Sequence, residues 1–564
     1  NIHLGLVRTV FLLSINVYKY SVNLPVSPSY SYSSNMSSIN PADHPILTAT
    51  AILLATALIV QAAKPNTKPK LIVQPHNRTP FISFRDLLGS PKEDPWKRLI
   101  TLARDSRNFP LCVMPGIVDM KPMVVINSVE MIKEVLVQGQ AVTNGEQKYA
   151  RAKEIRQASY AIFGGHNIGN TLGHEWKWRR QAFAPAFQPR QIIAALLPYT
   201  IDRVNSLNED LAKSAVAGTA VDLDEKMMDI TIDVICQYIF GFAGEGGDKG
   251  LDFQDIGGKS QLRRNFADLF GAFNSIWWRL PLIKYTEWSQ RPHKPARERL
   301  EALLNRAIEK SLSHPDLFLD ADSENPRCRP FIFQLAANSG FEPNTDHSLA
   351  KELVVILFAG HDTTSHTASF TFGLLAQNPD IQQKVFKEVR DLLGPGSINP
   401  DVLTSEVLSK MPYVTAVIKE SMRMYPVVNF LMVENLKDVT LGGLAVPAGT
   451  LILSNVRGAQ MDPNVFPNPE KFDPERWLDR DAEIETFQDV DQLRTRSSHP
   501  EFVFSLGPHA CIGRNLAQLE LRTLIAAVVN KFELKMKEGE TIDTRNVITM
   551  YPKNGIHVML KERD

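Results

Sequence analysis

A cysteine near the C-terminal end of the chain stands in a setting that favours metal chemistry. Cys511 lies between Gly507 and Gly513, directly before the amphipathic stretch RNLAQLELRTLIAAVV, which predicts a helix. A thiol at a helix start meets unpaired backbone N–H groups and the positive end of the dipole. Both stabilise a thiolate, the form in which cysteine ligates iron. The glycines let the backbone approach a flat cofactor. Phe504 can shield the sulfur from water, and His509 can hydrogen-bond an acidic group of that cofactor.

The alternative is that Cys511 behaves as a small buried hydrophobe, which is the usual fate of a lone cysteine. We expect this for the chain's other cysteines, Cys112, Cys236 and Cys328. Four scattered cysteines without a CxxC pair do not form a disulfide framework or a zinc site, and they suit a reducing compartment.

A second group of polar residues interrupts a strongly apolar helical pattern that ends at Asn378. The segment 359–364 reads AGHDTT. A threonine inside a helix can turn its hydroxyl onto the carbonyl four residues earlier and bend or open the helix. The alternative is a satisfied polar stripe. His361 and His366 are five residues apart instead of four, which argues against a helical zinc pair.

Two further patterns gain meaning only from their order along the chain. Glu420 and Arg423 share one helix face, and Arg476 follows about fifty residues later in FDPERW. Trp176 and Arg180 form a WxxxR pattern. By themselves these would be ordinary surface residues.

Taken together, these motifs resemble the cytochrome P-450 superfamily over roughly residues 85–564. The superfamily signature FxxGx(R/H)xCxG is matched at every fixed position, and 359–364 matches (A/G)Gx(D/E)T(T/S). The resemblance implies haem b with Cys511 as the axial iron ligand, and proton relay to dioxygen by Asp362 and Thr363. It also implies a buried ion network and a set of cofactor contacts. The network residues are Glu420, Arg423 and Arg476, and the cofactor contacts are Trp176, Arg180, Phe504, Gly507, His509 and Gly513.

The chain departs from the family pattern at the cofactor's acidic groups. His509 replaces the commoner arginine, and Val433 stands where the family often has another arginine. We therefore expect lighter neutralisation of the haem propionates, resting more on Arg180 and Trp176.

The resemblance implies a monooxygenase that inserts one oxygen atom from dioxygen into a lipophilic small molecule. Because the chain has no Walker loop, GxGxxG element or flavin region, electrons are expected from a separate NADPH-dependent flavoprotein reductase, with a cytochrome b-type protein as a further donor. The alternatives are a haem-thiolate isomerase or dehydratase and a non-catalytic haem-binding protein. The expected pocket residues are Phe358, Ala359, His361, Val428 and Phe430.

Composition and pattern predict a mainly α fold with small β-sheets (α+β). The 564 residues are 44% hydrophobic, and 62 basic residues balance 62 acidic ones, so no net charge favours nucleic acid as a partner. Long helical patterns cover 191–216, 222–242, 294–313, 346–377, 379–393 and 408–424. Short strand patterns cover 123–126, 439–441, 451–454 and 555–560.

The N-terminal region predicts membrane attachment. Residues 45–63 contain no charge and would span about 28 Å as a helix. Basic residues follow and few charges precede, which indicates a single-pass endoplasmic reticulum anchor with a cytosolic catalytic domain. A cleaved signal peptide is the alternative. We expect residues 1–44 to be an N-terminal extension that is not part of the mature protein, with Met36 a candidate start. Residues 64–84 are expected to form a proline-rich hinge, and 85–564 one catalytic domain.

Overall fold

The computed structural model describes most of the chain beyond residue 110. Described are residues 111–114, 123–138, 147–243, 251–252, 258–271, 293–315, 330–338, 340–342, 345–396, 398–478 and 501–563. The chain divides into two units, Asn1–Leu71 and Ile72–Asp564, and all described residues belong to the second. The predicted extension, anchor and hinge (1–44, 45–63, 64–84) lie outside the described residues. Within the described part, no helix has both the length and the apolar character needed to cross a bilayer.

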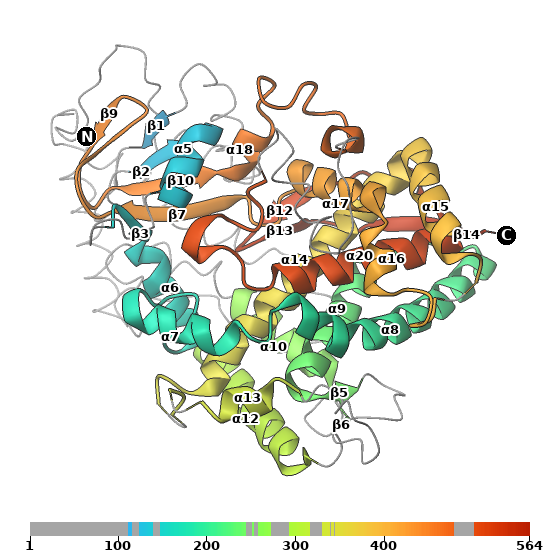
Figure 1. Cartoon of the computed structure of the whole chain (residues 1–564), viewed down its shortest axis with the longest axis horizontal. Coiled ribbons are helices and arrows are strands. Elements are labelled where there is room, and N and C mark those ends of the chain that lie inside the picture. Colours follow the sequence, from blue (N-terminus) through green and yellow to red (C-terminus); the bar gives the residue numbers. More distant parts are fainter. Residues whose placement is uncertain are drawn as a thin grey trace, which may run out of the picture. The chain divides into compact units, whose positions relative to one another are not determined.

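Helices make up most of the described part, as the sequence predicts (Figure 1). The longer ones are α6 (Lys153–Phe163), α7 (Gly173–Phe183), α8 (Pro189–Ala217), α9 (Leu223–Phe240), α10 (Lys259–Gly271), α12 (Lys294–Ser313), α14 (Leu349–Gln377), α15 (Pro379–Leu393), α17 (Pro412–Met424) and α20 (Arg514–Lys531). The shorter ones are α5 (Val129–Lys133), α13 (Ile332–Ala336), α16 (Ser405–Ser409) and α18 (Val456–Gln460). The helix predicted over 408–424 is wrong at its start, because Pro412 occupies the first turn of α17 and α16 precedes it as a separate helix.

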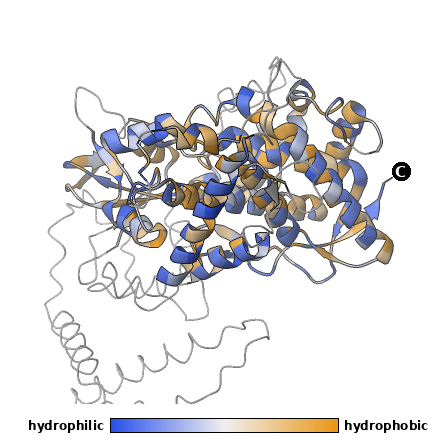
Figure 2. Cartoon of the chain, turned by 90° about the horizontal axis from the view of Figure 1, so that it is seen from below, coloured by the Kyte–Doolittle hydropathy of each residue, from blue (hydrophilic) through white to orange (hydrophobic). Residues whose placement is uncertain are grey.

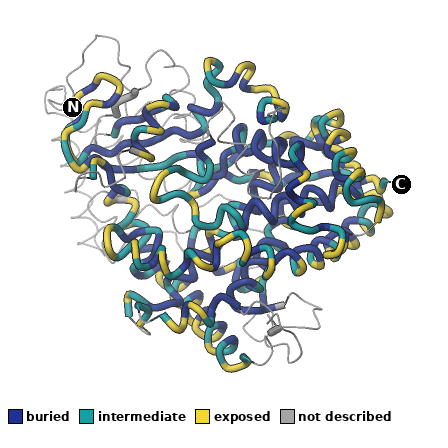
Figure 3. Tube along the Cα trace, viewed as in Figure 1, coloured by how far each residue is buried: buried dark blue, intermediate teal, exposed yellow. Residues whose placement is uncertain are grey.

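Helix α14 is the central element of the helical part. It packs against α9, α17 and α20, and nearly all of its side chains after Ser365 are buried (Figures 1 and 3). Three of its threonine hydroxyls are satisfied within the helix, because Thr363, Thr367 and Thr371 each donate to the carbonyl four residues earlier at 2.7–2.8 Å. Asn378 ends it, since Pro379 cannot continue the same helix. The outer helices carry hydrophilic and hydrophobic residues on different sides (Figure 2).

The largest described sheet has five strands in the order β1-β2-β10-β7-β3. These strands are β1 (Leu111–Met114), β2 (Met123–Ile126), β10 (Leu451–Asn455), β7 (Phe430–Asn435) and β3 (Tyr149–Arg151). β10 runs parallel to β2 and antiparallel to β7, and the register of β3 on β7 places Arg151 opposite Val433. A buried cluster of aliphatic side chains joins this sheet to α5 and α18.

Smaller sheets complete the described part. A three-stranded sheet has the order β11-β14-β4, and three strand pairs join β12 to β13, β5 to β6 and β8 to β9. Their bounds are β4 (Val221–Asp222), β5 (Phe242–Ala243), β6 (Leu251–Asp252), β8 (Val439–Leu441), β9 (Leu444–Val446), β11 (Phe532–Met536), β12 (Thr544–Asn546), β13 (Met550–Pro552) and β14 (His557–Glu562). Many helices with small sheets confirm the predicted fold class.

Candidate active site

The loop before α20 has a fixed shape. Its backbone turns through Ser505 and Gly507, both at positive φ (57° and 72°), and the amide of Cys511 donates to the carbonyl of Phe504 at 2.8 Å. Gly507 is required for a reason that its sequence position does not show. A Cβ there would collide with the carbonyl of Leu136, from the segment that follows α5, in addition to adopting an unfavourable φ. The loop that carries Cys511 therefore packs directly against the helical segment Glu134–Gln138.

The thiol of Cys511 has competing influences on its acidity. Burial raises its pKa, whereas the backbone N–H of Gly513 and the guanidinium of Arg180 lower it. The predicted stabilising contacts are present, but burial outweighs them in the free thiol. Because a metal ligand must be deprotonated, the thiolate form is tied to iron binding. Although protein atoms enclose the sulfur, the residue has accessible surface because it opens into an internal cavity.

That cavity has a volume of about 280 Å³ and lies between the cysteine loop and α14. Cys511, Phe504, His509 and Gly513 line it on the loop side, and Ala359 and Thr363 line it from α14. Most of its remaining lining is apolar, from residues such as Ile235, Ile356, Met422, Val427 and Leu516. A thiol on one wall and a hydroxyl-bearing helix on the other therefore face each other across an apolar space.

Cationic and polar side chains gather beside the cavity. The Arg180 guanidinium donates to the carbonyl of Ala510 at 2.9 Å, and the Trp176 ring lies 4.2 Å from that of His509. Burial, followed by the nearby charges of Arg151 and Arg180, lowers the pKa of His509 to about 4, so this side chain is a neutral imidazole. The positive charge beside the cavity is therefore carried by Arg151 and Arg180, and the neutral His509 adds none.

Arg151 is the member of this group that the sequence did not reveal. It donates to the carbonyls of Ile168 (3.1 Å) and Gly169, and its guanidinium lies 3.4 Å from His509 Nδ1. Burial, with the repulsion of nearby Arg156 and Arg180, lowers its pKa to about 10. Because it stands opposite Val433, it supplies a cation next to the strand where the family arginine is missing. Only the strand register could have shown this.

The cavity and the cations beside it match the apolar ring and the acidic edge of a haem. Among the described residues, no carboxylate acts on the crowded guanidinium groups of Arg151 and Arg180, so these groups need another anion. Haem propionates are anions on the edge of a flat apolar ring. The cavity is apolar beside that edge and carries a cysteine sulfur on one wall. Arg151, Arg180, Trp176 and His509 would hold the propionates, and Cys511 would hold the iron.

The predicted ion network is assembled and buried behind the cysteine loop. Glu420 accepts two hydrogen bonds from Arg423, both 2.8 Å, and one from Arg476 at 3.0 Å. The indole N–H of Trp477 donates a further bond at 2.8 Å, which the sequence did not predict. Glu420 and Arg423 have no exposed surface, so their charges are satisfied by one another, by the side chains of Arg476 and Trp477, and by backbone carbonyls.

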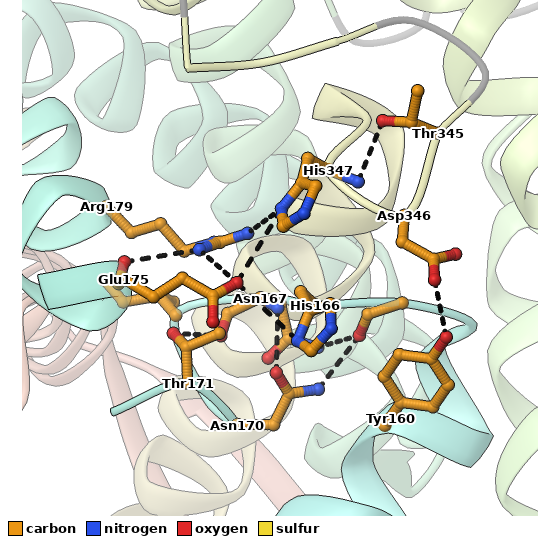
Figure 4. A network of polar contacts seen from close by, with 12 residues as sticks. Tyr160, His166, Asn167, Asn170, Thr171, Glu175, Arg179, Thr345, Asp346 and His347 are labelled. Atoms are coloured by element: carbon orange, nitrogen blue, oxygen red, sulfur yellow. Dashed lines mark hydrogen bonds and ion pairs between the residues drawn. The ribbon is translucent and has the colours of Figure 1, made fainter. Parts of the chain in front are cut away.

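A separate network positions α7, the helix that carries Trp176 and Arg180 (Figure 4). Arg179 is fully buried and bonds Glu352 of α14, while it also contacts Glu175 at 3.0 Å and His347 Nδ1 at 2.8 Å. Glu352 also accepts from the backbone N–H of Ile168 at 3.0 Å. One buried ion pair thus joins α7, the loop before it and the first turn of α14.

The expected substrate residues divide into two groups. Ala359 and Val428 line the cavity, whereas Phe358, His361 and Phe430 do not. The rings of Phe358 and His361 turn toward α10, where Phe266 lies 6.2 Å and 5.2 Å away from them. His361 Nδ1 also lies 2.8 Å from the carbonyl of Leu357. The side chains of Phe358 and His361 therefore fill the space between α14 and α10 instead of facing the cavity.

The family model for cytochrome P450 matches residues 93–559 of this chain. The chain belongs to the cytochrome P450 family. Among curated relatives, it is 28% identical over 420 residues to a probable cytochrome P450 4s3 of Drosophila melanogaster, covering 71% of this chain and 77% of that protein. A taurochenodeoxycholic 6 alpha-hydroxylase of Sus scrofa is 26% identical over 401 residues (69% and 74%). A solved cytochrome P450, CYP102L1, shares the fold with a TM-score of 0.65 at 20% identity, covering 88% of this chain and all of that one.

This cytochrome P450 is a monooxygenase and an oxidoreductase, and it binds haem b. When bound, a thiolate-ligated haem supplies the activation and cleavage of dioxygen. The protein contributes the rest. The apolar walls of the cavity would limit water, and the cations beside it would hold the acidic edge of the cofactor. Thr363 lines the cavity, and its hydroxyl donates a hydrogen bond to the carbonyl of Ala359.

Proposed function

We propose that this cytochrome P450 oxidises a lipophilic small molecule, with Cys511 as the axial ligand of its haem iron. The observation that supports this most directly is the position of the Cys511 sulfur, which opens into an apolar cavity opposite Thr363. The polar side chains among the cavity-lining residues are few, and apolar contacts favour a substrate with little charge at the oxidised position. The name of the pig relative, a bile-acid hydroxylase, agrees with a lipophilic substrate class.

We also propose how the enzyme receives electrons and where it works. Electrons come from a separate NADPH-dependent flavoprotein reductase, with a cytochrome b-type protein as a second donor. Residues 45–63 anchor the chain in the endoplasmic reticulum membrane, and residues 85–564 form one cytosolic catalytic domain. The uncharged 19-residue segment followed by basic residues supports the anchor.

The reduced carbon monoxide difference spectrum tests the ligand assignment. Cys511→Ala should lose the strongly red-shifted Soret band that the unaltered protein shows. Cys236→Ala is the matched control, because Cys236 is a buried free cysteine on α9 that does not line the cavity. A red-shifted band that persists in Cys511→Ala, or that is absent from the unaltered protein, would overturn the proposal. Taurochenodeoxycholate and dodecanoic acid are suitable first probes for substrate-induced spectral shifts.

A further inference from the structure

The carboxylate of Asp362 is not directed into the cavity that its neighbour Thr363 lines. Its Oδ2 accepts a hydrogen bond from the hydroxyl of Thr549 at 2.7 Å, in the turn between β12 and β13. Its Oδ1 lies 3.5 Å from Nε2 of His366, one helical turn further along α14. Of the two predicted proton-relay residues, Asp362 and Thr363, the aspartate therefore has its partners on the side of α14 that faces α9 and β13.

His366 connects that carboxylate to a second one on another helix. Its Nδ1 lies 2.9 Å from Oδ1 of Asp224, in the first turn of α9. The side chains of His366 and Asp224 are 6% and 12% exposed, so the imidazole is almost enclosed while the outer carboxylate retains some contact with solvent. The ring of Tyr551 on β13 lies 5.7 Å from the imidazole, and His361 is the other titratable group nearby on α14.

The charges favour an imidazolium between the two carboxylates. Burial disfavours the charged ring, but the hydrogen bonds and charges of Asp224 and Asp362 outweigh burial and raise the pKa of His366 to about 10. For Asp362, burial raises the pKa, and the contacts with His366, His361 and Thr549 together lower it. A carboxylate whose pKa is held low needs a proton source within reach, and Nε2 of His366 lies 3.5 Å from its Oδ1.

We propose that His366 is the proton donor that recharges Asp362, and that Asp224 is the positioning residue that holds its imidazole in place. This inference rests on the monooxygenase function proposed above and adds a residue to it. The arrangement uses an established principle, since a carboxylate on one ring nitrogen fixes the ring and directs the other nitrogen at its reaction partner.

The transfer is balanced in protons and moves no electrons between groups. Because the imidazolium is a much weaker acid than the Asp362 carboxyl, the transfer is uphill and occurs only as the proton is drawn onward from that carboxyl. In it, the N–H bond at Nε2 of the imidazolium breaks and an O–H bond forms at Oδ1 of Asp362. His366 becomes a neutral imidazole that keeps its Nδ1–H directed at Asp224, and a proton from water restores the imidazolium. Asp362 then passes its proton toward the Thr363 side of α14.

The competing explanation is a purely structural role, in which the triad of Asp224, His366 and Asp362 only stabilises the packing of α9 on α14. A buried ion triad is weak evidence of stability, because apolar replacements are often equally stable. The test must therefore include a readout that fastening alone would not change, which is the pH dependence of proton delivery.

The experiment uses the full-length haem-loaded enzyme with a recombinant NADPH-dependent reductase. The variants are His366→Gln, which keeps polar contacts without an ionisable ring, and Asp224→Asn, which removes the outer charge. His314→Gln is the matched control, because His314 is an exposed histidine after α12. For each protein, hydrogen peroxide released per NADPH oxidised is measured across pH, together with thermal stability and histidine ¹³C NMR.

In His366→Gln we expect complete reduction of dioxygen to water to fall by about 10²-fold, the lower end of what a positioned acid–base group contributes. Peroxide release should rise correspondingly. In Asp224→Asn the release of peroxide should increase only as the pH rises. The rise should begin at a lower pH than in the unaltered enzyme, because the pKa of His366 falls when its imidazolium loses one anionic partner. The histidine NMR signal that is absent from His366→Gln belongs to His366. In the unaltered protein the pKa read from this signal should lie well above the ordinary histidine range, and in Asp224→Asn it should lie closer to that range.

The inference is overturned if both variants retain the peroxide ratio and pH profile of the unaltered enzyme, or if His366 titrates in the ordinary range. It is also overturned if the variants lose thermal stability while their pH profile stays unchanged, since fastening would then explain the triad. A normal carbon monoxide spectrum and active turnover in the unaltered enzyme would leave the monooxygenase function standing in each of these cases.

Discussion

Removing the charge of Arg179 should destabilise the fold in a way that depends on pH. Arg179 and Glu352 are both fully buried and directly paired, and Arg179 also contacts Glu175 and His347. In Arg179→Met the aliphatic stem is roughly retained, but Glu352 loses its cation. Breaking one partner of a buried pair costs about 3–5 kcal/mol. A body of this size unfolds with an entropy of roughly 1 kcal/mol/K, so the melting temperature should fall by about 3–5 °C.

The pH dependence follows from Glu352. Burial raises its pKa to about 7, although Arg179 lowers it. Between the ordinary carboxyl value and that pKa, the folded protein holds a proton that the unfolded chain has lost. The stability that Glu352 contributes is therefore fully present at low pH, and it is lost as the pH rises through the pKa of Glu352 in the folded protein. Without Arg179 the pKa rises further, so the variant continues to lose stability above about pH 7, by up to about 1.4 kcal/mol per pH unit.

Thermal or urea unfolding at about pH 6 and about pH 8 measures both effects. The deficit of Arg179→Met should be clearly larger at the higher pH. The double variant Arg179→Met with Glu352→Gln should show a deficit without that pH dependence, and the exposed Arg190→Met serves as the control. A deficit below about 1 kcal/mol, or one equal at both pH values, would refute the role assigned to the buried pair.

Three shorter predictions concern the haem site, two of them haem capture and one the stability of the cysteine loop. Glu420→Gln removes the charge that two arginines and an indole N–H share, so it should yield mostly haem-free protein, as measured by the Soret-to-protein absorbance ratio. Arg151→Leu should weaken haem retention about tenfold, roughly the value of one lost charge-assisted hydrogen bond, as measured by transfer of haem to apomyoglobin; unchanged transfer would remove Arg151 from the propionate site. Gly507→Ala should cost at least about 1–3 kcal/mol, because its φ of 72° is strained for alanine, and unfolding experiments measure this loss.

The sequence predicted those parts of the site that depend on short spacings. The loop around Cys511 and the Glu420–Arg423 pair each lie within a few residues, so their geometry follows from the local turn or helix. The sequence did not predict Arg151, because its place beside His509 depends on the β3–β7 register. Nor did it predict that His361 would pack away from the cavity, since the rotation of a helix that is buried on nearly all sides is set by tertiary packing and not by its polar pattern.

The contact between Gly507 and Leu136 links two segments that are far apart along the chain. Such a contact forms only after a long loop has closed, and loop closure of this kind is slow. The loop that carries Cys511 and the segment 134–138 must therefore be in place together, so a substitution at Leu136, which is remote in sequence, would be felt at the thiol.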